Sequence, residues 1–322
     1  MFLEPVFDRV ESWANKKASI DINTPVLGIC RTLLACATLT TLVFNDYAVL
    51  FPEIKGIQSI LPEQDFFFNK ISIFTLVGEN YLLAKSVSVI ILLVTIIGWR
   101  PRVSAIFHWW ITFSLFSSSP SIDGGDQLAS ILTLLLVPIC LFDSRKWHWS
   151  DKKSRKSELS RYGFFVYTVY VVIRIQVSFV YFQVATHKFN VNEWMDGTVL
   201  YYWFNHPYFG LNKNLIWMSD LLFSSYITTS ILTWSILMLE LLLFMGLLSA
   251  KKYRVPLFWG GFIFHFFTWT IHGLFSFFLV MTSALILDLL PLDNSTLFDS
   301  LGIKRRLGNF FGKRSPFKTP EI

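Results

Sequence analysis

The hydrophobic and polar positions of this chain alternate on the scale of whole segments, with long apolar runs separated by polar turns. A membrane-spanning helix needs about 20 mostly apolar residues. Eight runs predict spanning helices, at about 25–44, 81–98, 103–117, 127–142, 162–188, 225–248, 255–272 and 274–290. The segments 64–74 and 192–204 are shorter and rich in aromatic residues, which is typical of helices in the membrane interface. The pattern predicts an all-α, polytopic membrane helical bundle of about eight transmembrane helices, with interfacial helices in the outer loops.

The positive charges fall on one side of this expected topology. Eight spans place both termini on the same side, and that side collects 21 Lys and Arg residues, whereas the opposite loops and span ends contain five. Because cytoplasmic loops carry the excess of Lys and Arg, we expect both termini in the cytoplasm and the protein in the cell membrane. The chain then divides into an amphipathic cytoplasmic segment (1–24), a transmembrane domain (25–290) and a basic cytoplasmic tail (291–322).

Composition narrows the class of protein further. The chain of 322 residues is 53% hydrophobic and carries a net charge of +6. This charge lies in the loops between apolar runs, where it sets topology, so the lipid bilayer is the expected partner and nucleic acid is not. Cys30, Cys36 and Cys140 all fall inside predicted spans, at spacings that fit neither a metal site nor a disulfide framework. Asp126 is placed to cap the fourth span.

The stretch from Arg174 to Trp203 contains most of the chemistry that the sequence offers. Ionisable groups in a membrane helix cost about 2.5–3.5 kcal/mol each on insertion scales, so they normally face a bundle interior or a cavity. Arg174, Tyr181 and Lys188 follow one another at two-turn steps and therefore share one helix face. Beside an outward-facing cavity roofed by the aromatic loop 189–224, Lys188 would lose hydration and act as a neutral base. The alternative is an interfacial lysine whose amine reaches the lipid headgroups.

The other ionisable groups inside the predicted spans have structural and functional interpretations. Glu240 is expected to pair with Arg174, because intramembrane charges pair and the two residues lie at compatible depths. His265 and His272 lie two turns apart on one face of the seventh run. A structural hydrogen bond is the default for each, and proton handling is the alternative, since histidine titrates near neutral pH. Two histidines alone do not make a metal site, so no metal is expected.

Several stretches resemble a known family. YFQVATHKFNVNEWMDGTVLYYW (181–203) has an aromatic pair before a small residue and a lysine, then Trp, Gly and an aromatic helix. GFIFHFFTWTIHGLFSFFLVMTSALI (261–286) has an in-membrane histidine before an aromatic helix. With GWRPRVSAIFHWWITFSLFSS and IDGGDQLASILTLLLVP, they resemble the vitamin K-dependent γ-carboxylase-related membrane domain, often called HTTM. The chain is identified as a member of its bacterial sporulation-delaying protein B (SdpB) type, over roughly residues 20–290.

The resemblance implies roles for particular residues. Lys188 falls on the position of the carboxylase's catalytic base, which deprotonates vitamin K hydroquinone, and His265 falls on an active-site histidine. It implies an HTTM-like domain over 25–290 and a γ-carboxylase-related membrane enzyme that acts on a peptide precursor, in the production of a secreted antimicrobial peptide. Whether the chain is an enzyme stays open, because the large luminal domain of the animal carboxylases is absent. A quinone-type lipid is the cofactor that the resemblance offers. The supporting residues are Arg174, Glu240, His272, Tyr181 and Trp194.

Two other classes of function stay open. In a peptide or proton transporter, or an immunity protein, Arg174, Glu240 and the histidines would line a route. The absence of an internal repeat and of paired broken helices argues against this class. In a non-catalytic membrane scaffold for a toxin-maturation complex, the basic loop 143–161 would dock a soluble or peripheral partner at the cytoplasmic face.

Overall fold

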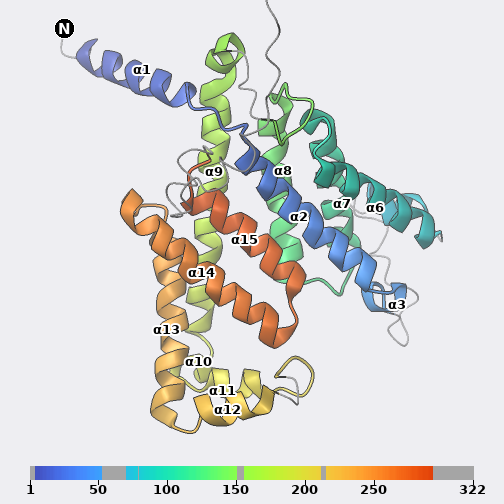
Figure 1. Ribbon diagram of the computed structural model, residues 1–322, viewed down its shortest axis with the longest axis vertical. Helices are drawn as coiled ribbons and strands as arrows, with labels where there is room; N and C mark the ends of the chain where they lie inside the picture. Colours follow the sequence, from blue (N-terminus) through green and yellow to red (C-terminus); the bar gives the residue numbers. More distant parts are fainter. Residues whose placement is uncertain (1–3, 53–69, 79, 151–155, 212–214, 293–322) are drawn as a thin grey trace, which may run out of the picture.

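The computed structural model describes residues 4–52, 70–78, 80–150, 156–211 and 215–292, and these form helices joined by short turns. After α1 (Glu4–Ala18), the long helices run in alternate directions, so that their connections gather at two ends of the bundle (Figure 1). They are α2 (Pro25–Phe44), α6 (Tyr81–Ile97), α7 (Pro101–Ser118), α8 (Gly124–Leu141), α9 (Lys156–Lys188), α13 (Tyr226–Met245), α14 (Lys251–His272) and α15 (Phe275–Leu289). Short helices occupy the connections at one end: α3 (Tyr47–Leu50), α5 (Ile73–Leu76), α10 (Asn192–Met195), α11 (Val199–Phe204) and α12 (Ile216–Leu222).

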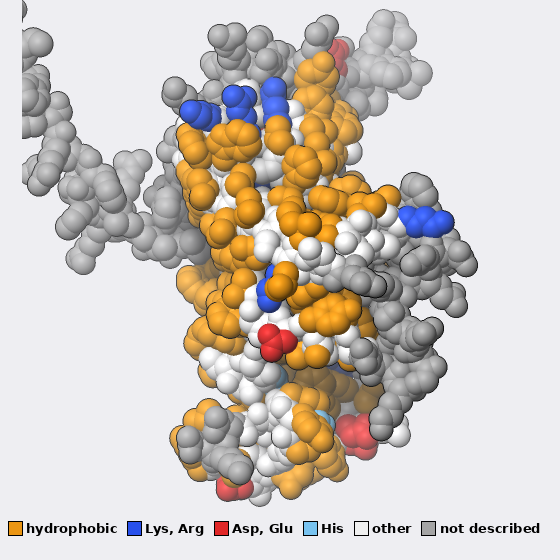
Figure 2. Space-filling view, turned by 90° about the vertical axis from the view of Figure 1, so that its right-hand side faces the viewer, with side chains coloured by type: hydrophobic (Ala, Val, Ile, Leu, Met, Phe, Trp, Pro, Cys, Tyr) orange, Lys and Arg blue, Asp and Glu red, His pale blue; other side chains and the backbone are white. Residues whose placement is uncertain are grey.

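Several of these helices have the length and composition of membrane spans. Four are long and apolar enough to cross a membrane, namely α2, α8, α13 and the part of α9 from Tyr162 to Lys188. Two more, α6 and α15, are apolar but shorter. Figure 2 shows Lys and Arg side chains gathered near one end of the molecule, above a broad band of hydrophobic side chains. The all-helical architecture with several candidate spans is thus confirmed, whereas the count of eight spans and the side of the termini stay predictions.

Several element boundaries differ from those that the sequence predicts. The fourth predicted span begins earlier, at Gly124, because Asp123 rather than Asp126 is the N-cap: its Oδ1 accepts a hydrogen bond from the Asp126 N–H at 2.9 Å. The run 192–204 is not one helix, since Gly197 (φ +75°) separates α10 from α11. A left-handed residue ends a helix, and glycine adopts it without strain. The first part of the run 64–74 and residues 293–322 of the tail lie outside the described residues.

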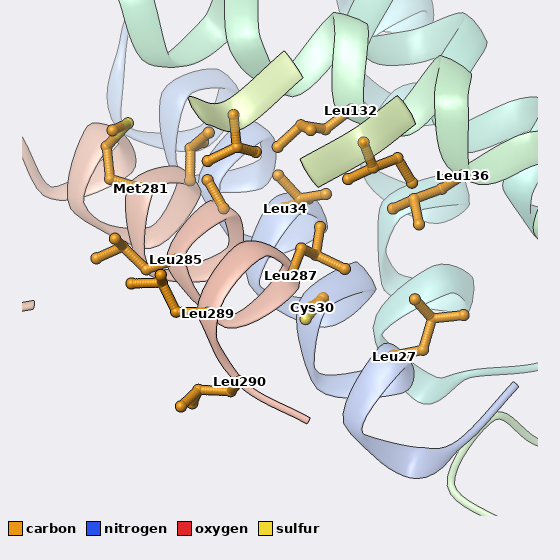
Figure 3. Packing of buried hydrophobic residues seen from close by; sticks show 14 of the residues in the cluster. Leu27, Cys30, Leu34, Leu132, Leu136, Met281, Leu285, Leu287, Leu289 and Leu290 are labelled. Atoms are coloured by element: carbon orange, nitrogen blue, oxygen red, sulfur yellow. The ribbon is translucent and has the colours of Figure 1, made fainter. Parts of the chain in front are cut away.

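The core of the bundle is built around α2, which packs against α15, α6 and α8. In Figure 3, the α2 side chains Leu27, Cys30 and Leu34 lie among leucines of α8 and α15. A second apolar cluster joins the C-terminal half of α2 to α6 and α7. α9, α13 and α14 lie to one side of this core, where α9 packs on α13 and α14 packs on α15. The two sides of the bundle meet at α15, which contacts both α2 and α14.

The turn after α8 is fastened to the bundle by a buried arginine of α2. Arg31 is 1% exposed; its Nη1 donates to His148 Nδ1 at 3.1 Å and its Nη2 donates to Ser104 Oγ at 2.8 Å. The histidine therefore accepts with a neutral ring. Burial, with the nearby charges of Arg31 and Arg145 adding to it, lowers the pKa of His148 from 6.5 to about 3.

Acidification is expected to loosen this turn. Below pH 6.5 the unfolded chain protonates His148, whereas the folded chain does so only near pH 3. The stability that the neutral ring contributes is therefore complete above pH 6.5 and is lost progressively as the pH falls towards 3. The thermal unfolding midpoint of the purified protein should be lower at pH 5 than at pH 7.5. His148→Asn, which keeps an acceptor for Arg31 but does not titrate, should reduce this difference; an equal pH response in both proteins would contradict the assignment.

Candidate functional site

The centre of the candidate site is an ion pair between the last residue of α9 and a residue in the second half of α13. Lys188 Nζ lies 2.5 Å from Glu240 Oε1, with side chains that are 15% and 4% exposed. The same amine lies 4.1 Å from the centroid of the Trp194 ring, on α10. Trp194 is itself buried against α13. The amine is therefore held between a carboxylate and an aromatic face, and it is not an interfacial lysine in open solvent.

A second polar pair lies beside the first. Tyr181 Oη is 3.0 Å from His265 Nε2, and both side chains are buried. Tyr181 stands two turns before Lys188 on α9, and His265 comes from α14. Lys188 interacts electrostatically with His265, and Tyr181 with Glu240. The structure thus brings five of the seven sequence-predicted residues into one cluster, where the end of α9 meets α10, α13 and α14.

Arg174 does not pair with Glu240, so that prediction is wrong. Arg174 Nε donates to the backbone oxygen of Asp288 at 2.8 Å and lies 3.4 Å from its Oδ1, while Glu240 pairs with Lys188. Asp288 lies near the end of α15, which packs directly on α9. Because α9 packs on both α13 and α15, depth decides between the two carboxylates: Arg174 lies beside Asp288, whereas Glu240 lies beside Lys188, fourteen residues further along α9. Arg174 therefore lies outside the cluster.

His272 also lies apart from the cluster. Its Nδ1 is 2.7 Å from the backbone oxygen of Phe209, and its ring meets the edges of Trp203 and Phe204. This contact joins the end of α14 to the aromatic connection that contains α11. The structure gives His272 a packing and hydrogen-bonding role at this connection.

Two polar residues of α13 were missed from the sequence. Ser230 and Thr233 are buried and share a helix face with Glu240, at steps of three and seven residues. Ser230 lies against Gly197, where an added Cβ would approach its Oγ to 2.7 Å. Four buried atoms of this region have no hydrogen-bond partner in the described part of the chain: Ser230 Oγ, Thr233 Oγ1, Glu240 Oε2 and His265 Nδ1. The helical spacing of these two hydroxyl residues from Glu240 is the sequence signal that could have identified them.

The cluster has the groups needed to move a proton in an apolar setting. If the proton on Lys188 Nζ passes to Glu240 Oε1, the amine becomes neutral and the carboxyl group becomes an acid, with no net change in buried charge. The neutral amine is then a base, and Tyr181 and His265 supply a further donor and acceptor. Within the described residues, no group of three or more His, Cys, Asp and Glu side chains could hold a metal ion.

The fold and this cluster define a class: an all-helical membrane protein with paired ionisable groups inside the bundle. The chain is 36% identical to the uncharacterized protein YitO of Bacillus subtilis, over 89% of this chain and 91% of that protein. It is 32% identical to the sporulation-delaying protein SdpB of the same organism, over 91% of this chain and 86% of that protein. The chain belongs to the SdpB family.

The other comparisons leave the wider relationship open. No protein-family model matches the chain, and no solved structure matches it. The resemblance to the HTTM domain therefore stays a prediction, as do the domain division and the catalytic roles that it implies.

Proposed function

We propose that this chain is needed for the production or maturation of a secreted antimicrobial peptide of the sporulation-delaying type. The observation that carries the proposal is the relation to SdpB over 91% of the chain, because it extends through every long helix of the bundle. The peptide precursor is the proposed partner, reached from the outer end of the bundle. The lipid bilayer is the setting, with both termini on the cytoplasmic side.

The proposed chemistry takes place at the cluster around Lys188. The amine exchanges its proton with Glu240, Trp194 shields it from water, and His265 is held by Tyr181 at the edge of the site. Such a cluster supports general acid–base catalysis on a group of the precursor, which typically contributes about 10²–10⁴-fold to a rate. We retain a γ-carboxylase-related reaction as the form of this proposal. The bond that changes in the precursor is left unspecified.

Replacing Lys188 by Arg is expected to abolish peptide production while the protein still inserts. Arginine keeps the positive charge and the pairing with Glu240, but it does not give up its proton. A Bacillus subtilis strain that lacks SdpB, and receives this chain in its place, would be scored for secreted killing activity. We expect activity at least about 100-fold lower with Lys188→Arg than with the unchanged chain.

Lys85→Arg is the matched control, because Lys85 is also an outer lysine but donates to the Asn45 carbonyl on the other side of the bundle. Both variants should reach the membrane fraction in equal amounts. Full killing activity from Lys188→Arg would remove the catalytic proposal and favour a scaffold or transport role. Failure of the unchanged chain to restore killing would argue against the shared function itself.

A further inference from the structure

Two arginines lie near one carboxylate, that of Asp288 at the end of α15, away from the candidate site. Asp288 interacts electrostatically with both Arg174 and Arg254, and the two arginines also interact with each other. Arg174 contacts Asp288 through Nε, whereas its Nη2 is buried with no hydrogen-bond partner in the described part of the chain. Arg254 donates from Nε to the Ser249 carbonyl. Asp288 therefore has one guanidinium group in contact and a second within electrostatic range, and Arg174 has a buried donor to spare.

Other cations extend this positive surface. Lys251 and Lys252 are exposed in the first turn of α14, which contains no acidic residue. Lys17, near the end of α1, lies 5.2 Å from the centroid of the Tyr167 ring of α9. Tyr167 in turn interacts electrostatically with Arg254. Cations from α1, α9 and α14 thus lie near one another around the start of α14.

We propose that Arg174 and Arg254 form a binding site for a phosphate group, supplied by the headgroup of an anionic phospholipid. A guanidinium offers paired N–H donors that match phosphate oxygens, and it binds phosphate in proteins more often than lysine does where geometry matters. The free donor on Arg174 lies between helices, and Arg254 is half-buried beside the exposed first turn of α14, so a phosphate seated there would meet both. Basic pockets between membrane helices bind anionic headgroups by this chemistry.

The position of the site fits a lipid better than a freely diffusing anion. Asp288 and Arg174 are nearly buried, and α9 continues from Arg174 through the rest of its candidate membrane span. The acyl chains of a bound phospholipid would lie along the exposed apolar side chains of α9 and α14. Among these, on the side of the two arginines toward the bilayer centre, are Ile175, Phe179, Trp259 and Ile263. A soluble phosphate would use the same two arginines but gain nothing from this surface.

The test compares the full-length protein in nanodiscs of phosphatidylcholine alone and with added phosphatidylglycerol. Phosphatidylglycerol should raise the unfolding midpoint of the unchanged protein. It should also remain bound in native mass spectrometry after transfer to detergent. In Arg254→Gln, the apparent affinity for phosphatidylglycerol should fall by about tenfold or more, since each lost hydrogen bond to a charged group costs that much. Arg102→Gln is the control, because Arg102 is exposed at the turn between α6 and α7 and lies outside this cluster.

The outcomes separate the two sources of phosphate and the two explanations of the charge. An equal shift of the midpoint in Arg254→Gln and the unchanged protein would overturn the site, because general surface charge would then explain the effect. Inorganic phosphate added to the phosphatidylcholine sample distinguishes the sources. A shift from inorganic phosphate that is as large as that from the lipid, and absent in Arg254→Gln, supports the arginine site but overturns the lipid source. No shift from inorganic phosphate supports the lipid.

Discussion

Lys188→Met is expected to lower the free energy of unfolding by about 3–5 kcal/mol, the usual cost of removing one partner of a buried ion pair. The variant leaves Glu240, whose side chain is 4% exposed, without the cation that it contacts at 2.5 Å. Methionine matches the length of the lysine stem, so the loss arises mainly from the unpaired carboxylate. Denaturant or thermal unfolding of the purified protein in a membrane mimetic gives the measurement.

The double variant Lys188→Met with Glu240→Leu separates a structural role of the pair from a chemical one. Apolar replacement of both partners of a buried ion pair is often neutral or stabilising, so most of the lost stability should return. Killing activity should nevertheless stay at the level of Lys188→Met, because no amine is restored. If both stability and activity returned, the pair would be a structural contact alone. Lys85→Met is the control, because it removes a lysine that lies away from the cluster.

Arg145→Leu is expected to destabilise the end of the bundle that contains the turn after α8 by a similar amount, about 3–5 kcal/mol. Arg145 holds Asp143 through Nε and Nη2 at 2.9 and 2.7 Å, and both side chains are nearly fully buried. Its Nη1 also donates to the carbonyls of His148 and Ser150, so the whole turn after α8 depends on it. Loss of the arginine leaves the Asp143 carboxylate buried and unpaired. The unfolding midpoint again reports the change.

Lys146→Leu provides the comparison for this prediction. Lys146 follows Arg145 directly but is exposed, and its amine lies over the Trp147 ring at 5.8 Å. Substitutions at such exposed positions usually change stability by no more than about 0.5 kcal/mol. A loss as large as that of Arg145→Leu would mean that general charge at this end, rather than the buried pair, holds the turn.

The long helices could be predicted from the sequence because each one is an apolar run between polar turns, which is a local property of the chain. The observed helix boundaries differ from the predicted ones where a capping residue or a glycine was assigned incorrectly. Asp123 caps α8 in place of Asp126, and Gly197 divides the run that looked like one interfacial helix. α9 also begins at Lys156, several residues before the predicted span, because charged residues are tolerated in a helix outside the membrane.

The sequence alone could not predict which residues of neighbouring helices contact one another. A helical pattern gives the depth and the face of a side chain, but not which neighbour stands opposite. α9 packs on both α13 and α15, and the structure sets Asp288 beside Arg174 but Glu240 beside Lys188, fourteen residues further along α9. The sequence did place Lys188 and Tyr181 on one face of α9, and in the structure both side chains belong to the same cluster. Their partners, Glu240 and His265, were named as site residues but not as their contacts.

The length of α9 has a consequence for the bilayer around the protein. Its apolar part spans 27 residues, which at 1.5 Å per residue is about 40 Å, against a hydrocarbon thickness of about 30 Å. A helix that exceeds the local thickness leans or thickens the surrounding lipid. Because Lys188 is the final residue of this helix, the thickness of the host membrane sets how far its amine stands from the water boundary.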